Sequence, residues 1–164
     1  MKKEILLKYA EITDFTQLSK LEKTLIKRAV ESANSAYAPY SKFNVGSALV
    51  LGNNQIIIGS NQENASFPAG ICAERVALFS SHANYPQEII KQIAITAIAE
   101  NFSLSEPVGP CGVCRQVLLE YEEKQGSDIE VLLFDTKKII KLARAKDLLP
   151  FYFKEDRLKQ LKKI

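Results

Sequence analysis

Cysteine, histidine and long apolar runs are all scarce in this chain. Its 164 residues include three cysteines and one histidine. An odd, sparse set of cysteines does not make a disulfide scaffold and favours a reducing compartment, so we expect a cytoplasmic protein. No apolar run approaches the roughly 20 residues of a membrane-spanning helix. The apolar stretch at 5–7 is also too short for a secretory signal, so no membrane partner is expected.

Net charge is also small, at +3 for pH 7. The sequence has no basic stripe with interleaved aromatic residues that could follow a nucleic-acid strand, so we expect no nucleic-acid partner. A run of basic residues at a terminus is more often a solvated tail than a nucleic-acid contact. Here that run comprises Lys154, Arg157, Lys159, Lys162 and Lys163.

The length of the chain predicts one domain over residues 1–164, large enough to bury a core. We place the core at about 17–153, between a short N-terminal extension and the basic C-terminal tail. Apolar residues recur every three or four positions from about Gln17 to Tyr37 and predict a helix. Asp14 or Thr16 is its expected cap, and Pro39 is expected to end it.

Strands are expected to alternate with helices after an opening hairpin. The hairpin is predicted over 43–50 and 55–59, and later strands over 93–98, 129–134 and 139–143. Helices are predicted to begin near Cys72 and Cys111. This α/β pattern indicates a three-layer α/β/α sandwich with a mixed five-stranded sheet. Both cysteine runs then lie at one end of the sheet, where ligands bind in open α/β folds.

The cysteines lie in two short runs. Cys111 and Cys114 form a Pro-Cys-x-x-Cys motif, and Cys72 precedes Ala73-Glu74-Arg75. A Cys-x-x-Cys pair alone fits a redox pair, a zinc site or neither. A third cysteine favours zinc with three protein ligands, which leaves one coordination position for water and is typical of a catalytic site. Zinc lowers the pKa of such water towards neutrality.

Two charged residues beside Cys72 fit this interpretation. Glu74 is expected near the open position, where it can take and pass on a proton. The alternative is an acid in the first turn of a helix that only interacts favourably with the helix dipole. Arg75 is expected to compensate the charge of three thiolates, rather than simply face solvent. The only histidine, His82, lies ten residues beyond Cys72. That is roughly 15 Å along a helix, too far to close the metal shell.

The motif pair is typical of zinc deaminases that act on nucleobases. The sequence resembles the small homotetrameric cytidine deaminases from about Leu18 to Phe153. The stretches that carry this resemblance are Ala38-Pro39-Tyr40-Ser41-Lys42-Phe43-Asn44-Val45-Gly46, Asn61-Gln62-Glu63-Asn64-Ala65, Cys72-Ala73-Glu74-Arg75 and Pro110 to Gln116.

The resemblance implies a reaction and a role for each of several residues. It implies that Cys72, Cys111 and Cys114 bind one Zn²⁺ per subunit, with Glu74 as proton shuttle. The implied reaction is hydrolytic deamination of cytidine and deoxycytidine to uridine and deoxyuridine plus ammonia, as in pyrimidine salvage. It further implies that Asn61 and Glu63 hold the ribose, that Phe43 stacks on the pyrimidine and that Ala73 offers its backbone to the base. Ala65, Phe67 and Phe153 would serve the site of a neighbouring subunit in a homotetramer.

Some features depart from the family pattern. Ser66-Phe67 stands where the family usually has Ala-Tyr, so a phenol oxygen is lost. The segment 100–109 looks longer than usual. Two alternatives stay open at this point: a related zinc deaminase for another aminopyrimidine nucleoside, and a non-catalytic zinc-stabilised binding module.

Overall fold

The computed structural model describes residues 1–155 and 158. The helices are α1 (Lys20–Ala33), α2 (Ala73–Asn84) and α3 (Gly112–Gln125), with short 3₁₀ turns η1 (Phe15–Gln17), η2 (Phe67–Ala69) and η3 (Ala145–Leu148). The strands are β1 (Ala10–Ile12), β2 (Phe43–Leu51), β3 (Ile56–Ser60), β4 (Ile90–Ala99), β5 (Glu130–Phe134) and β6 (Ile139–Leu142). Four residues of the basic tail, Arg157, Lys159, Lys162 and Lys163, lie outside the described residues.

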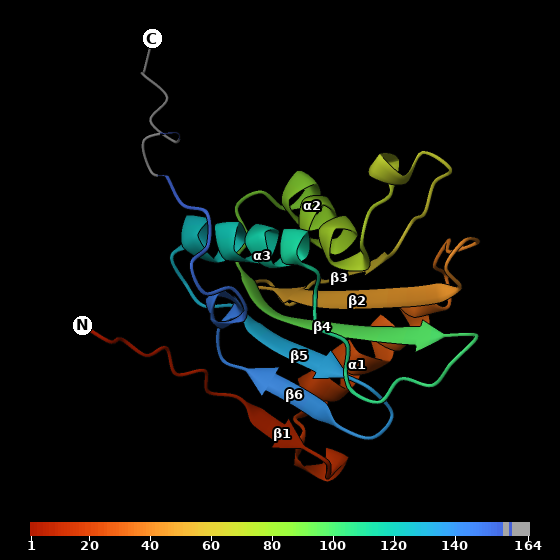
Figure 1. Ribbon diagram of the computed structural model, residues 1–164, viewed down its shortest axis with the longest axis horizontal. Coiled ribbons are helices and arrows are strands. Elements are labelled where there is room, and N and C mark those ends of the chain that lie inside the picture. The colour runs from red at the N-terminus through yellow and green to blue at the C-terminus, as the bar shows by residue number, and fades with distance from the viewer. Residues whose placement is uncertain (156–157, 159–164) are drawn as a thin grey trace.

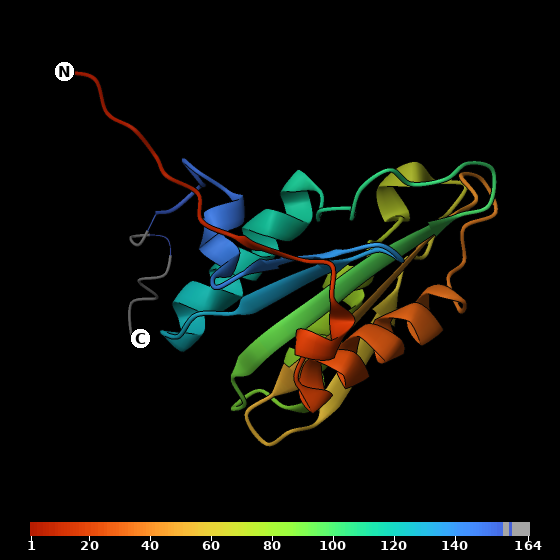
Figure 2. The same cartoon turned by 90° about the horizontal axis from the view of Figure 1, so that it is seen from below.

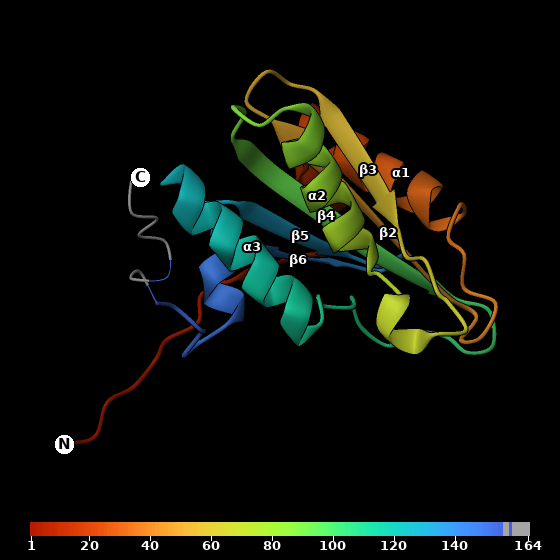
Figure 3. The ribbon, with the colours of Figure 1, turned by 90° about the horizontal axis from the view of Figure 1, so that it is seen from above.

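The strands form one six-stranded sheet in the order β1-β6-β5-β4-β2-β3. Only β4 and β5 pair in parallel, and the other neighbours are antiparallel. Helix α1 covers one face of the sheet, while α2 and α3 lie side by side on the other (Figures 1 and 3). The predicted α/β/α sandwich with a mixed sheet is therefore confirmed.

The prediction of five strands is wrong, because β1 adds a sixth. This strand is three residues long and pairs antiparallel with β6, with Ala10 opposite Lys141 and Ile12 opposite Ile139. It is mostly exposed and too short for an alternating apolar pattern, so its sequence carries no strand signal. β1 forms because β6 offers a free edge with which this segment can pair (Figure 2).

Alternation along β2 separates two apolar cores. Leu49 and Leu51 point to the α2/α3 side and pack with Leu78 and Leu118. On the α1 side, Ala48 and Val50 pack with apolar residues that include Leu25, Ile26, Ala29, Ala94, Leu132 and Ile139. Burial of both strand faces explains why β2 is apolar over its second half. Among the described residues, no helix has the length and apolar character needed to cross a bilayer.

Helix α1 is shorter than predicted at both ends. Its cap is Ser19, whose hydroxyl and the Glu22 carboxylate form a reciprocal capping box, while Asp14 caps η1 instead. The helix ends at Ala33, well before Pro39. Tyr37 then exchanges backbone hydrogen bonds with the segment 61–63, and this tertiary pairing draws the chain out of the helix.

Two glycines shape the other helices, Gly59 through the packing of α2 and Gly126 through the end of α3. A Cβ at Gly59 would lie 2.6 Å from the Ala77 nitrogen and would also strike the Ala73 carbonyl, so glycine lets α2 approach β3 closely. Helix α3 starts at the predicted position and ends at Gly126, whose φ of 67° makes the left-handed stop. Both helices begin at the same end of their layer (Figure 3).

Candidate metal and catalytic site

The three cysteine sulfurs meet where α2 and α3 begin. The Sγ atoms of Cys72 and Cys111 are 3.8 Å apart, those of Cys111 and Cys114 are 3.5 Å apart, and all three lie within 4.8 Å of one another. Tetrahedral zinc with Zn–S bonds of about 2.3 Å needs sulfurs about 3.8 Å apart. The residue types and the spacing therefore fit one zinc ion.

Helix geometry supports thiolates at this position. Cys72 and Cys111 are the N-cap residues of α2 and α3, and neither caps its helix through a side-chain hydrogen bond. The unpaired N–H groups and positive dipole ends of both helices therefore face the sulfurs. Hydrogen bonds from Cys114 and from Arg75 lower the pKa of the Cys72 thiol, whereas the hydrogen bond with Cys72 and burial raise the pKa of Cys114. Arg75 Nη2 lies 3.8 Å from Cys72 Sγ, where the sequence placed it.

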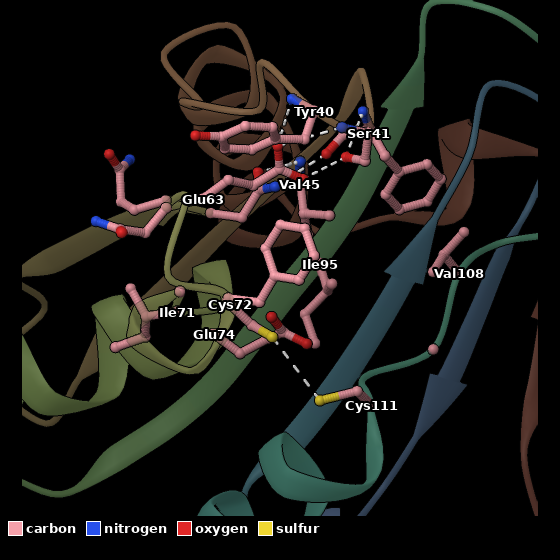
Figure 4. Close-up of a pocket in the computed structure, with 17 residues that line it drawn as sticks. Tyr40, Ser41, Val45, Glu63, Ile71, Cys72, Glu74, Ile95, Val108 and Cys111 are labelled. Carbon is pink, nitrogen blue, oxygen red and sulfur yellow. Dashed lines mark hydrogen bonds between the residues drawn. The ribbon is translucent and has the colours of Figure 1, made fainter.

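Glu74 is the unusual acid of the site. It is only 3% exposed, and its Oε2 atom has no hydrogen-bond partner among the described residues. Burial raises the pKa of this carboxyl, and the negative charge of Cys72 raises it further. The carboxyl group lies beside the Cys72 sulfur on the pocket side (Figure 4). A buried, unpartnered acid next to a metal-ligating group is suited to proton transfer.

His82 takes no part in this cluster. It lies in the last turn of α2, where its ring contacts Lys124, with Nζ 2.9 Å from Nε2, and packs edge-on against Tyr121. The described part of the chain gathers three metal-ligating residues here, all cysteines. The expectation that His82 does not complete the shell agrees with this geometry.

A cavity of about 510 Å³ opens onto the sulfurs. Most of the predicted site residues line it: Phe43, Asn61, Glu63, Phe67, Cys72, Glu74 and Cys111. Five predicted residues do not: Cys114 and Arg75 at the sulfur cluster, and three others. Ala65 is exposed beside it, Ala73 is buried in the first turn of α2, and Phe153 is 70% exposed and hydrogen-bonded through its backbone to Gln116 on α3.

The two predicted ribose-binding residues are held by the protein itself. Asn61 Oδ1 accepts from the Val45 N–H at 2.7 Å, and Asn61 Nδ2 donates to the Phe43 carbonyl at 2.9 Å. Glu63 accepts from the N–H groups of Tyr40 and Ser41 and from the Ser41 hydroxyl. The Ser41 hydrogen bond is the chief cause that lowers the pKa of Glu63. Both side chains therefore tie the cavity rim together, and Glu63 stays ionised.

Several residues that line the cavity were not predicted from the sequence. Tyr40, Ser41 and Val45 lie within the stretch around Phe43 that carries the family resemblance, yet Phe43 alone received a role there. Ile71, Ile95 and Val108 complete the wall from three separate segments (Figure 4). Nothing in the pattern of these apolar residues separates a cavity wall from an ordinary core position.

Comparison with known proteins agrees with this site. A family profile described as the cytidine and deoxycytidylate deaminase zinc-binding region matches residues 19–126. The chain belongs to this deaminase family. The predicted membership is thus confirmed, and the zinc cofactor with it, because the family is zinc-binding and the cysteine group can hold a metal ion.

Individual members of the family are similar over most of the chain. Cytidine deaminase of Halalkalibacterium halodurans is 38% identical over 129 residues, which span 79% of this chain and 91% of that protein. Cytidine deaminase of Mycobacterium tuberculosis is 35% identical over 130 residues, or 79% of this chain and 87% of that protein. The crystal structure of cytidine deaminase from Burkholderia pseudomallei has a TM-score of 0.69 at 38% identity, covering 80% of this chain and 98% of that one.

Proposed function

We propose that the chain catalyses the zinc-dependent hydrolytic deamination of cytidine and deoxycytidine, giving uridine and deoxyuridine plus ammonia. The observation that carries this proposal is the unpartnered Glu74 carboxylate, buried beside three convergent sulfurs and lining a cavity of about 510 Å³. A closed structural zinc site has no use for a cavity or for an unpaired acid.

The cysteines supply the metal site in this proposal. Cys72, Cys111 and Cys114 hold Zn²⁺, and Arg75 compensates their charge through its hydrogen bond to Cys72. When bound, zinc supplies an activated water molecule for attack on the substrate. The positive ends of α2 and α3 lower the free energy of the thiolate form of these ligands.

Glu74 moves the protons of the reaction. Its carboxylate takes a proton from the attacking water and delivers it to N3 of the cytosine ring as the C4–O bond forms. The carboxylate next takes the proton of the new C4 hydroxyl and passes it to the exocyclic nitrogen, so the C4–N bond breaks as the C4 carbonyl forms, and ammonia leaves. Water is consumed and no redox partner is needed. The raised pKa of Glu74 favours its protonated form, which is the form that donates in the second half.

The rim of the cavity provides the substrate contacts. Phe43 presents an aromatic ring for stacking on the base, and the Ala73 backbone lies beside the metal ligands in sequence. Asn61 keeps one Nδ2 hydrogen and one Oδ1 lone pair beyond its bonds to β2, and a carboxylate such as Glu63 accepts from a sugar hydroxyl. A diol suits this donor and acceptor pair.

A second copy of the chain is part of the proposal. Phe67 and Phe153 are large apolar residues that are 75% and 70% exposed, and Ala65 is exposed close to Phe67 in sequence. We propose that they serve a neighbouring subunit's site in a homotetramer. We also propose a cytoplasmic location, because three unpaired cysteines suit a reducing compartment.

Ammonia release from a panel of aminopyrimidine nucleosides tests the function. The panel contains cytidine, deoxycytidine and base-modified analogues, with zinc content measured on the same samples and Glu74→Gln as control. We expect release from cytidine and deoxycytidine that the substitution abolishes. Release from a modified nucleoside alone would favour the related deaminase, and full zinc content without any ammonia would favour the binding module.

A further inference from the structure

The segment 100–109, which joins β4 to α3, reaches from the mouth of the cavity to the metal site. We propose that Phe102 in this segment is a positioning residue that supports Phe43 against the bound base, and that ion pairs from β1 and the β5–β6 turn hold the segment in place. The inference rests on the proposed function, because it assigns Phe43 to the base.

Phe102 stacks against Phe43 and does not itself line the cavity. The two ring centroids are 6.1 Å apart, and the ring planes differ by 19°. Phe43 lines the cavity, whereas Phe102 does not and is 57% exposed. A nearly parallel neighbour restricts the rotation of the Phe43 ring and keeps its other face available for a base.

Both ends of the segment are anchored to the site. At its start, the Glu100 N–H donates to the Lys42 carbonyl at 3.0 Å, next to Phe43. At its end, Val108 and Gly109 line the cavity, and Arg115 Nε donates to the Pro110 carbonyl at 2.8 Å. One connection therefore links the aromatic wall to Cys111 (Figure 1).

Ion pairs hold the middle of the segment. Lys138, in the turn between β5 and β6, lies 2.6 Å from Glu106 and 3.3 Å from Glu11. Its side chain is only 18% exposed, so this cation is held between the two carboxylates. Glu11 lies on β1, which precedes residue 19, where the family match begins. The added strand thus connects to the segment that carries Phe102.

The test compares Phe102→Ala with the conservative Phe102→Tyr. Loss of the aromatic pair is expected to raise KM for cytidine roughly 2- to 10-fold, with kcat within about twofold and zinc content unchanged. Tyrosine keeps the stacking and should restore KM. The dissociation constant of uridine, measured by calorimetry, should rise by a similar factor, which separates binding from turnover.

The ion pairs are tested by Lys138→Met, with Lys137→Met as the matched control on the neighbouring exposed lysine. Because Glu106 is 60% exposed, the expected rise in KM is below about fivefold. The rise should vanish in the Phe102→Ala background, since both changes act through the same ring.

The outcomes separate this inference from the proposed function. An active wild-type enzyme whose KM and uridine affinity are unchanged by Phe102→Ala overturns the role of Phe102 alone. Equal losses of kcat and zinc would make Phe102 a merely structural residue and also overturn it. A wild-type protein that neither binds nor deaminates nucleosides overturns the proposed function, and this inference falls with it.

Discussion

Two buried glutamates in the helical layer, Glu74 and Glu122, are treated in opposite ways. Their exposed fractions are nearly equal, at 3% and 4%. Glu122, near the end of α3, accepts hydrogen bonds from the N–H groups of Ile129, Ala145 and Lys146. Glu74, in the first turn of α2, leaves one oxygen without a partner among the described residues.

In the layer of α2 and α3, one buried glutamate links neighbouring segments and the other faces the sulfur cluster. Glu122 joins α3 to the start of β5 and to η3, so its carboxylate replaces backbone partners that these segments lack. Glu74 instead keeps its Oε2 oxygen without a partner beside the Cys72 sulfur (Figure 4). Burial alone therefore does not separate these two acids, whereas the unpartnered oxygen of Glu74 does.

Glu74→Gln is the largest expected change. Glutamine fills the same space but cannot accept and return a proton, so kcat should fall about 10²- to 10⁴-fold. Zinc content should stay at the wild-type value, and thermal stability should not fall, because glutamine removes a buried ionisable group without leaving a cavity. Steady-state kinetics with metal analysis check this, and a kcat within tenfold of wild type would contradict the role of Glu74.

Gly59→Ala should disturb the end of the layer that carries Glu74. The new methyl group meets backbone atoms of Ala73 and Ala77, which cannot move aside like a flexible side chain. We expect a loss of about 3 kcal/mol in the free energy of unfolding, with lower activity because the start of α2 shifts. Gly112→Ala is the control, because a Cβ there meets nothing within 4 Å. Equal urea midpoints for the two variants would refute the close packing.

Glu122→Gln should affect the other end of the layer. It removes charge-assisted hydrogen bonds to three N–H groups, so the free energy of unfolding should fall by about 2 kcal/mol. The kcat should remain within about twofold of wild type. Urea unfolding at fixed protein concentration measures the first effect. A loss of activity with unchanged stability would show that Glu122 is more than a structural link.

Arg75→Ala is the smallest expected change. Arg75 contacts a ligand sulfur and would act on the metal only through it, so zinc affinity should weaken about tenfold. Competition with a chelator measures this affinity. Arg75→Lys keeps the charge without the planar guanidinium and should recover part of the loss. Unchanged zinc retention in Arg75→Ala together with full activity would remove the role proposed for Arg75.

Most of the fold could be predicted because its signals are local. Periodicity located α1, and the strand-like runs at 43–50 and 55–59 located the β2–β3 hairpin. The cap of α1 was missed although its Ser19–Glu22 capping box is a local signal, whereas the other errors arose where tertiary pairing outweighed local preference. Tyr37 leaves the helix to pair with the segment 61–63, and β1 exists because β6 offers it a free edge.

The sequence by itself determined the metal chemistry, since its three cysteines supply the donor set for zinc, and it predicted Glu74 as the acid. It also determined that α2 and α3 begin at these cysteines. Only the tertiary structure decided that buried Glu74 keeps one oxygen without a partner while Glu122 accepts three backbone hydrogen bonds, and that Phe102 stacks on Phe43. The physical reason is that desolvation and hydrogen-bond satisfaction depend on which distant segments come together, and spacing along the chain does not specify that.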